Sequence, residues 1–342
     1  MSSERRGAAQ TTQGLPASAW RYAARRTWHG FVRHRGLDSA AALTFFSALA
    51  LFPGALTVVS VFALSEGTRD AATVILGIVD EVAQASTVET LRQPIIQLFT
   101  IANPALALAI GLILSLWSLS SFSTAFGRAV NSVYEVQEGR QIWKFRGLML
   151  VLALFLLVIF GAIVALLIIT PSVAAAIGGA VGVGAPWITI WSIGRWPILV
   201  ILVALVMGVL YYVTPNVRHE RLRWVSFGAL FAIVAWALAT TLFGLYVTNV
   251  GTYDRIYGWL GGGLALLVWL YITNVVLVLG AEVDAEVMRL RQLGAGIAAE
   301  EVVQLPMRDT TRNLMLARQR AQDVSDGRAI REQSAAASRD VH

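Results

Sequence analysis

The stretch LTFFSALALFPGAL (residues 43–56) lies in the middle of an apolar run that extends from Ala40 to Leu64. A run of this length forms a helix that can cross the roughly 30 Å hydrocarbon core of a bilayer. Similar runs recur along the 342-residue chain, of which 56% is hydrophobic and only 14% is charged, with a mean hydropathy of +0.65. Soluble domains carry about 25% charged residues. The sequence therefore predicts an all-α, polytopic membrane protein.

We predict six transmembrane helices from the lengths of the apolar runs. Their expected bounds are about Ser39–Leu64, Ala105–Phe126, Leu148–Thr170, Ile193–Val213, Val225–Val247 and Tyr257–Ala281. They divide the chain into a basic amphipathic segment over 1–38, a membrane domain over 39–291 and a mobile tail over 292–342, with helical pieces around Asn313–Val324. Within the membrane domain, apolar residues at helical spacing over 70–100 indicate amphipathic helices on the outer surface.

The distribution of Lys and Arg predicts the orientation of the spans. Of the 27 basic residues, seven precede the first span, four lie between the second and third spans, and three lie between the fourth and fifth. Nine more follow the sixth span, from Arg289 onward. The other side carries only Arg69, Arg92 and Arg255, and Arg195 lies at the outer end of the fourth span. We therefore expect both termini to be cytoplasmic.

The N-terminal segment WRYAARRTWHGFVRHRG (residues 20–36) combines aromatic side chains with five arginines. One interpretation is a cytoplasmic interfacial helix that anionic lipid headgroups hold in place. The other is an ordinary basic flank of the first span, which explains the charges equally well. The residues before it have no apolar core, so we expect no cleavable signal peptide there.

Five stretches together resemble one known family. They are AALTFFSALALFPG at 41–54, FGRAVNSVYEVQEGRQIWKFR at 126–146, YYVTPNVRHERLRWVSFGAL at 211–230, YVTNVGTYDRIYGWLGG at 246–262 and WLYITNVVLVLGAEVDAE at 269–286. The chain is similar, over about residues 30–290, to the YihY/BrkB family of bacterial inner-membrane proteins, once labelled ribonuclease BN. The resemblance implies six membrane helices. It also implies a link to virulence or serum resistance and to the handling of envelope lipids.

The residues themselves argue against an enzyme. The chain has no cysteine, and its four histidines, His29, His34, His219 and His342, are too scattered for a metal cluster or an acid–base pair. No phosphate-binding loop of the GxxxxGK[ST] type is present, so we expect no ATP-driven pumping by this chain alone. We therefore predict no catalytic residue, no metal and no cofactor, and we expect the chain not to be a ribonuclease.

The Pro53–Gly54 pair is the main candidate for a hinge or a cavity. Proline at position 53 removes the amide that would bond the carbonyl of Leu49, and a bilayer tolerates this only where neighbouring groups or water satisfy that carbonyl. We expect Thr44 and Ser47 to provide hydrogen bonds on the cytoplasmic side of the break. A static bend that improves packing is the alternative interpretation.

Other polar side chains inside the spans have the same two interpretations. Ser118 and Ser121 lie on one face of the second span, and Asn274 lies deep in the sixth. Small hydroxyl faces most often mediate helix packing, but they can also line a polar path.

A third candidate site is formed by charged residues. Glu282 and Glu286 are four residues apart at the cytoplasmic end of the sixth span, so they share one helical face. Carboxylates at the edge of the hydrocarbon usually have a basic partner. We expect that partner among Arg128, Arg146, Arg218, Arg221 and Arg223. The pair is then either a structural ion pair or a gate, headgroup or proton site, and Arg195 is expected to meet a phosphate or to extend toward the interface among tryptophans.

We therefore expect an inner (plasma) membrane protein that transports or handles a lipid-like amphipathic substrate for the cell envelope. The alternative is a scaffold or envelope-integrity factor that transports nothing. The expected partners are membrane lipids, through anionic headgroups at the cytoplasmic face, and not nucleic acid. A homo-oligomer is a further candidate assembly.

Overall fold

The computed structural model describes residues 16–64, 103–168, 186–218, 226–249 and 260–339. These residues form eight α-helices: α2 (Ala17–Arg33), α3 (Gly36–Leu64), α6 (Pro104–Val133), α7 (Ile142–Ile168), α9 (Pro186–Val213), α10 (Phe227–Asn249), α12 (Leu260–Gly294) and α13 (Thr311–Arg339). The amphipathic helices predicted over 70–100 lie outside the described residues.

Six of these helices, α3, α6, α7, α9, α10 and α12, are long and apolar enough to cross a membrane. The described residues thus confirm the all-α class and the six predicted spans. The main difference is at the end of α12, which continues to Gly294 instead of ending near Ala281. Charged side chains continue this helix because they are buried against other parts of the chain: Glu282, Glu286 and Arg289 are all nearly inaccessible to solvent.

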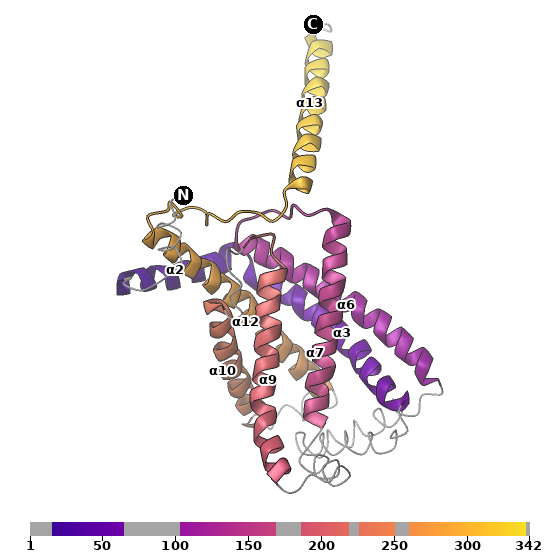
Figure 1. Ribbon diagram of the computed structural model, residues 1–342. Coiled ribbons are helices and arrows are strands. Elements are labelled where there is room, and N and C mark those ends of the chain that lie inside the picture. The colour runs from indigo at the N-terminus through magenta and orange to yellow at the C-terminus, as the bar shows by residue number, and fades with distance from the viewer. Residues whose placement is uncertain (1–15, 65–102, 169–185, 219–225, 250–259, 340–342) are drawn as a thin grey trace.

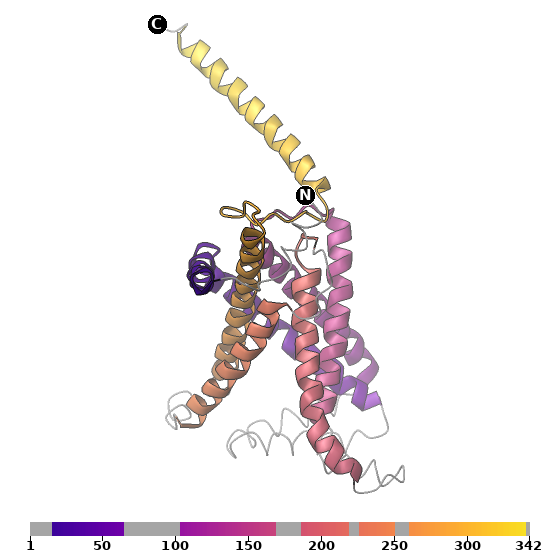
Figure 2. The same cartoon turned by 60° about the vertical axis from the view of Figure 1, so that its left-hand side comes forward.

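Figure 1 shows α2 lying across one end of the bundle, with α13 projecting away from the same end. We call this the polar end, formed by α2, the C-terminal ends of α6, α9 and α12, and residues 295–310. Its position relative to the cell remains a prediction. In Figure 2, α10 and α12 lie close to α9 and α7 near the polar end and diverge from them toward the other end.

A close crossing joins α10 to α12 and depends on two glycines. A Cβ atom on Gly228 would overlap the carbonyl oxygen of Gly280, and one on Gly280 would overlap the hydroxyl group of Tyr211. Small residues let helix backbones approach in this way inside a membrane, where no hydrophobic effect drives helices together. The two glycines therefore set the distance between the fifth and sixth spans.

The core lies in the half of the bundle nearer the polar end. Phe126 is fully buried, and its ring stacks on Phe122 and Tyr211, with centroids 6.3 and 5.7 Å apart. The Tyr211 hydroxyl donates a 2.6 Å hydrogen bond to the carbonyl of Leu277. The ring stack joins α6 to α9, and the hydrogen bond of Tyr211 joins both to α12.

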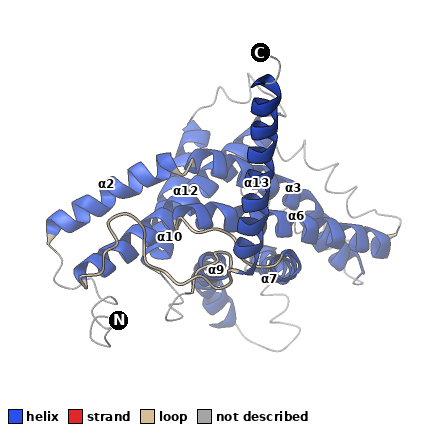
Figure 3. Cartoon of the chain, turned by 90° about the horizontal axis from the view of Figure 1, so that it is seen from above, coloured by secondary structure: helices blue, strands red, loops and turns tan. Residues whose placement is uncertain are grey.

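The segment after α12 differs from the mobile tail expected from residue 292. Residues 295–310 lie across the polar end, where Ala299 and Val303 are buried and Val217 forms an isolated β-bridge with Met307. Figure 3 shows this loop passing over the ends of the helices. Only α13, which includes the predicted helical piece at Asn313–Val324, extends away from the bundle with exposed side chains.

Candidate functional site

An apolar groove of about 450 Å³ lies between α3 and α12, next to the proline break. Its lining consists of Ala48, Leu51, Phe52, Gly263, Leu264, Leu266 and Leu267. Phe52 is 75% exposed, so the groove is reached from the side of the bundle. The volume is within the range of about 300–1,000 Å³ that ligand pockets occupy. The groove therefore offers room for an apolar chain beside Pro53.

The carbonyls around Pro53 are satisfied by hydroxyl groups. Ser118 of α6 donates to the carbonyl of Leu49, the group that proline leaves without an amide, in a long hydrogen bond of 3.5 Å. Thr57 donates to the carbonyl of Pro53 at 2.8 Å, and its oxygen lies 3.3 Å from the Ser115 hydroxyl. The support therefore comes from α6 and from the next turn of α3, and not from the side expected. The sequence did not single out Thr57 for this role.

Thr44 and Ser47 instead contact Asn274 of α12. The Asn274 amide nitrogen lies 3.3 Å from each of the two hydroxyl oxygens and donates to the carbonyl of Leu270 at 2.9 Å. Asn274 is only 2% exposed. Thr44 and Ser47, predicted to act together, and Asn274, predicted separately, thus form one amide–hydroxyl cluster. Because Thr44 is one turn from Ala48, this cluster adjoins the groove on its polar-end side.

Three other predicted residues lie apart from the groove and the cluster. Ser121 donates to the carbonyl of Trp117 in its own helix. Gly54 faces the ring of Phe160 in α7, where a Cβ atom would be in ordinary contact at 3.4 Å. The guanidinium of Arg195 stacks on Trp196 with 5.2 Å between group and centroid. Whether Arg195 meets a phosphate or extends toward the interface stays a prediction.

Glu282 is buried at the polar end, against α2. It is 1% exposed, and its Oε1 lies 2.7 Å from Nδ1 of His34. The other imidazole nitrogen lies 3.7 Å from Glu135, which follows α6. A Cβ atom on Gly30 would be 2.7 Å from Oε2 of Glu282, so only glycine leaves space for this carboxylate against α2. His34 therefore joins the sixth span to the N-terminal helix.

Glu286 lies on the same face of α12, as its spacing predicts. It contacts Nε of Arg289 at 3.1 Å and Nε of Arg26 at 3.4 Å. Burial of Arg26 on its own would lower its pKa, but Glu286 and Tyr22 together outweigh this and raise the pKa. Arg289 also donates to the carbonyls of Ala299 and Glu301. The pair thus holds residues 295–310 against α12.

The partners of the two glutamates differ from those predicted. The expected candidates were arginines of the connections between spans, Arg128, Arg146, Arg218, Arg221 and Arg223, of which the last two lie outside the described residues. The observed partners are His34 and Arg26 from the N-terminal segment and Arg289 from the same helix. Only the Glu286–Arg289 spacing was visible in the sequence, because residues three apart meet on a helix.

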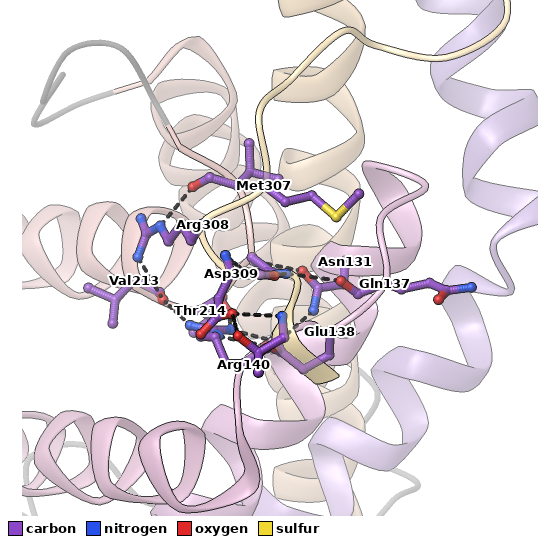
Figure 4. A network of polar contacts seen from close by, with 12 residues as sticks. Asn131, Gln137, Glu138, Arg140, Val213, Thr214, Met307, Arg308 and Asp309 are labelled. Atoms are coloured by element: carbon purple, nitrogen blue, oxygen red, sulfur yellow. Dashed lines mark hydrogen bonds and ion pairs between the residues drawn. The ribbon is translucent and has the colours of Figure 1, made fainter. Parts of the chain in front are cut away.

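A second polar network, shown in Figure 4, joins α6, α9 and the tail. Arg140 forms a two-point ion pair with Glu138, with both nitrogen–oxygen distances at 2.7 Å. It also donates to the carbonyl of Thr214 at the end of α9. Asn131 donates to Glu138 at 3.0 Å. Two-point arginine–carboxylate pairs fix geometry well, so this network holds the end of α6 against the end of α9.

Asn216 and Arg308 extend this network to the tail. The backbone amide of Asn216 donates to Asn131, and its side-chain amide donates to the carbonyl of Asp309 at 2.8 Å. Arg308 donates to the carbonyls of Val217 and Tyr212, and burial lowers its pKa. The sequence did not single out Asn216 or Arg308, although polar residues that follow apolar spans were a usable signal.

Most of the buried charged groups at the polar end are paired with one another. Within the described ranges, no group of three His, Asp or Glu side chains could hold a metal ion. The carboxylates of Glu282, Glu286, Glu138 and Asp284 each face an arginine, a histidine, a tyrosine or a backbone amide. The polar end of the described structure therefore connects helices, whereas the groove between α3 and α12 has room for a molecule.

Comparisons with known proteins agree with this architecture. A family model described as "Virulence factor BrkB" matches residues 27–302. A protein named as ribonuclease-like, YfkH of Bacillus subtilis, is 30% identical over 270 residues, which cover 77% of this chain and 94% of the relative. A UPF0761 membrane protein of Alkalilimnicola ehrlichii is 26% identical over 283 residues, or 78% of this chain and 59% of the relative. No solved structure matches.

Proposed function

The chain belongs to the virulence factor BrkB family, and from this premise we propose that it handles a lipid-like amphipathic substrate in the bacterial inner membrane. The observation that carries the proposal is the apolar groove between α3 and α12. Its lining has no charged or hydrogen-bonding side chain, so the group that it accepts is a hydrocarbon chain.

The surroundings of the groove support an amphipathic rather than a purely apolar ligand. The amide–hydroxyl cluster of Asn274, Thr44 and Ser47 lies next to it, toward the polar end. A molecule with its chain in the groove would have its polar part near these groups. Phe52 and Leu264 are both exposed at the groove, so such a molecule would enter sideways from the bilayer.

We propose an orientation in which the polar end is cytoplasmic. The support is the basic residues of α2 and of the tail, which gather at this end, as the positive-inside rule requires. A reporter fused after residue 292 should then be active only in a cytoplasmic format, and a tag near Ser86 should be labelled from outside. A periplasmic reporter would contradict the orientation.

A scaffold or envelope-integrity role is the second candidate. It is favoured by the dense pairing at the polar end, where Glu282 and Glu286 contact His34 and Arg26 of the N-terminal segment, and Glu138 pairs with Arg140, which also bonds the end of α9. In this case the groove is filled permanently by bilayer lipid and nothing moves through the protein.

Lipid movement in proteoliposomes separates the two. We expect vesicles with the wild type to move a fluorescent phospholipid analogue between leaflets faster than empty vesicles. Leu267→Trp should slow this several-fold because the larger ring fills the groove. The matched control is Leu238→Trp, an exposed position on α10 away from the groove. Inert wild-type vesicles, or equal slowing by both variants, would favour the scaffold.

A further inference from the structure

The N-terminal helix α2 has a one-sided charge. It contains four arginines and no acidic residue among its 17 residues, and Arg35 follows directly. Two of these arginines point to the protein: Arg26 contacts Glu286 and Arg33 contacts Glu135. Among the described residues, Arg21 and Arg25 have no ion-pair partner and are exposed. A positive charge is therefore left over on the outer face of α2.

That outer face also carries apolar side chains. Arg21, Arg25, Trp28 and Val32 follow the spacing i, i+4, i+7 and i+11, which places them along one side of a helix. Trp28 is 63% exposed and Val32 is 60% exposed. We call these four residues the α2 stripe. Exposed tryptophan next to arginine is the composition of a helix that lies in the headgroup region of a membrane.

The position of α2 agrees with this composition. The helix lies across the bundle rather than along it, and its N-terminal part extends past α10 in Figure 1 and along the edge of the bundle in Figure 3. Trp20 packs on Phe227, the first residue of α10, with ring centroids 5.6 Å apart. Because a membrane span begins there, α2 lies at the depth of the lipid headgroups, beside the bundle and over lipid.

We propose that the α2 stripe binds the surface of anionic phospholipids. Arg21 and Arg25 pair with headgroup phosphates, for which the planar guanidinium is well suited. Trp28 and Val32 enter the boundary between headgroups and chains. On the opposite side of this N-terminal segment, Arg26 and His34 contact the glutamates of α12. Anionic lipid therefore strengthens the α2–α12 contact by fixing α2 from outside.

The depth of the stripe can be measured directly because the chain has no cysteine. His29→Cys lies beside the stripe, and Gln322→Cys on α13 is the matched control; both positions are exposed. A spin label at 29 should lie at headgroup depth in vesicles with phosphatidylglycerol, whereas the label at 322 should remain in water. Equal access of a water-soluble relaxation agent to both labels would overturn the proposal.

Lipid selectivity is the second measurement. The full-length protein in nanodiscs should show a preference for binding phosphatidylglycerol over phosphatidylcholine. The double variant Arg21→Gln/Arg25→Gln should lower this preference by about 25-fold, since each basic residue near an anionic surface contributes roughly a factor of five. The control Arg318→Gln/Arg320→Gln removes the same charge from α13 and should leave it unchanged.

The outcomes distinguish the possible sources of an effect. Equal losses in both double variants would mean that only net charge matters, and would overturn the assignment to the α2 stripe. Competition by inorganic phosphate at an equal molar amount would mean that the arginines bind free anions, and would also overturn it. Neither result bears on the groove, because lipid movement is measured separately.

Discussion

The two halves of the bundle are built differently. At the polar end, α2, α6, α9, α12 and the tail are connected by buried polar side chains. Arg140 pairs with Glu138 and bonds the end of α9, and Arg289 pairs with Glu286 and bonds the carbonyl of Ala299 in the tail. In the other half, many large apolar side chains are exposed, and the described helices diverge in Figure 2. There an apolar groove separates α3 from α12.

This difference indicates which half can change shape. Breaking a buried ion pair leaves an uncompensated charge, so the polar end resists rearrangement. Apolar contacts between membrane helices have no comparable cost, because lipid tails replace them. We infer that the polar end holds the spans in register while the groove half adapts to a ligand.

The largest effect is expected at the polar end. Arg140→Met removes the cation from a nearly buried pair and leaves Glu138 uncompensated, which should cost about 3–5 kcal/mol of unfolding free energy. Thermal unfolding in detergent would detect this. Arg318→Met, exposed on α13, is the control and should unfold like the wild type. A stable Arg140→Met variant would mean that the polar end is not the fixed half.

A smaller loss is expected at the α2–α12 contact. Glu282→Leu removes the partner of His34 and should cost about 2 kcal/mol, the range for hydrogen bonds to charged groups. Glu282→Gln retains a hydrogen-bonding group of similar size and should lose less. If both variants and the wild type unfold at the same temperature, the carboxylate is hydrated and joins nothing.

At the boundary between the halves, we expect a substitution to cause only a small loss of stability. The double variant Thr44→Val/Ser47→Ala removes both hydroxyl acceptors of Asn274 and leaves its bond to the carbonyl of Leu270. Hydrogen bonds between membrane helices contribute about 0.6 kcal/mol each, so we expect a loss of about 1 kcal/mol and a partial decrease in lipid movement. A loss as large as that of Arg140→Met would extend the fixed half to the groove.

The smallest change in stability is expected at the break itself. Pro53→Ala restores an amide near the carbonyl of Leu49, which Ser118 already satisfies in part. The change should alter the free energy of unfolding by less than about 1 kcal/mol. We expect normal insertion but slower lipid movement per folded molecule, because a continuous helix would be stiffer beside the groove. Reduced stability with unchanged movement would identify a static bend.

Much of the fold follows from local sequence, whereas the contacts do not. Each span is specified by its own apolar run, so six helices were predictable without tertiary information. Glu282 and Glu286 were correctly placed on one face for the same reason. Their partners were not predictable, because His34 and Arg26 are about 250 residues away and reach α12 only through the crossing of α2.

The position of the tail was also not predictable from local sequence. Residues 295–310 have no periodic apolar pattern, and what holds them in place is long-range: Arg289 bonds their carbonyls, and Asn216 bonds Asp309. Similarly, no local signal indicates that Ser118 faces Leu49 or that Ala48 and Leu267 line one groove. These depend on the packing of helices that are distant in the chain.

The most direct test of the central claim compares distances across the two halves by pulsed electron paramagnetic resonance. Cysteine pairs replace the exposed Phe52 and Leu264 at the groove, and the exposed Leu37 and Val302 at the polar end. We predict a broad distance distribution across the groove that narrows or shifts when lipid is added, and a narrow, lipid-independent one at the polar end. Two distributions of equal width, neither responding to lipid, would contradict the account.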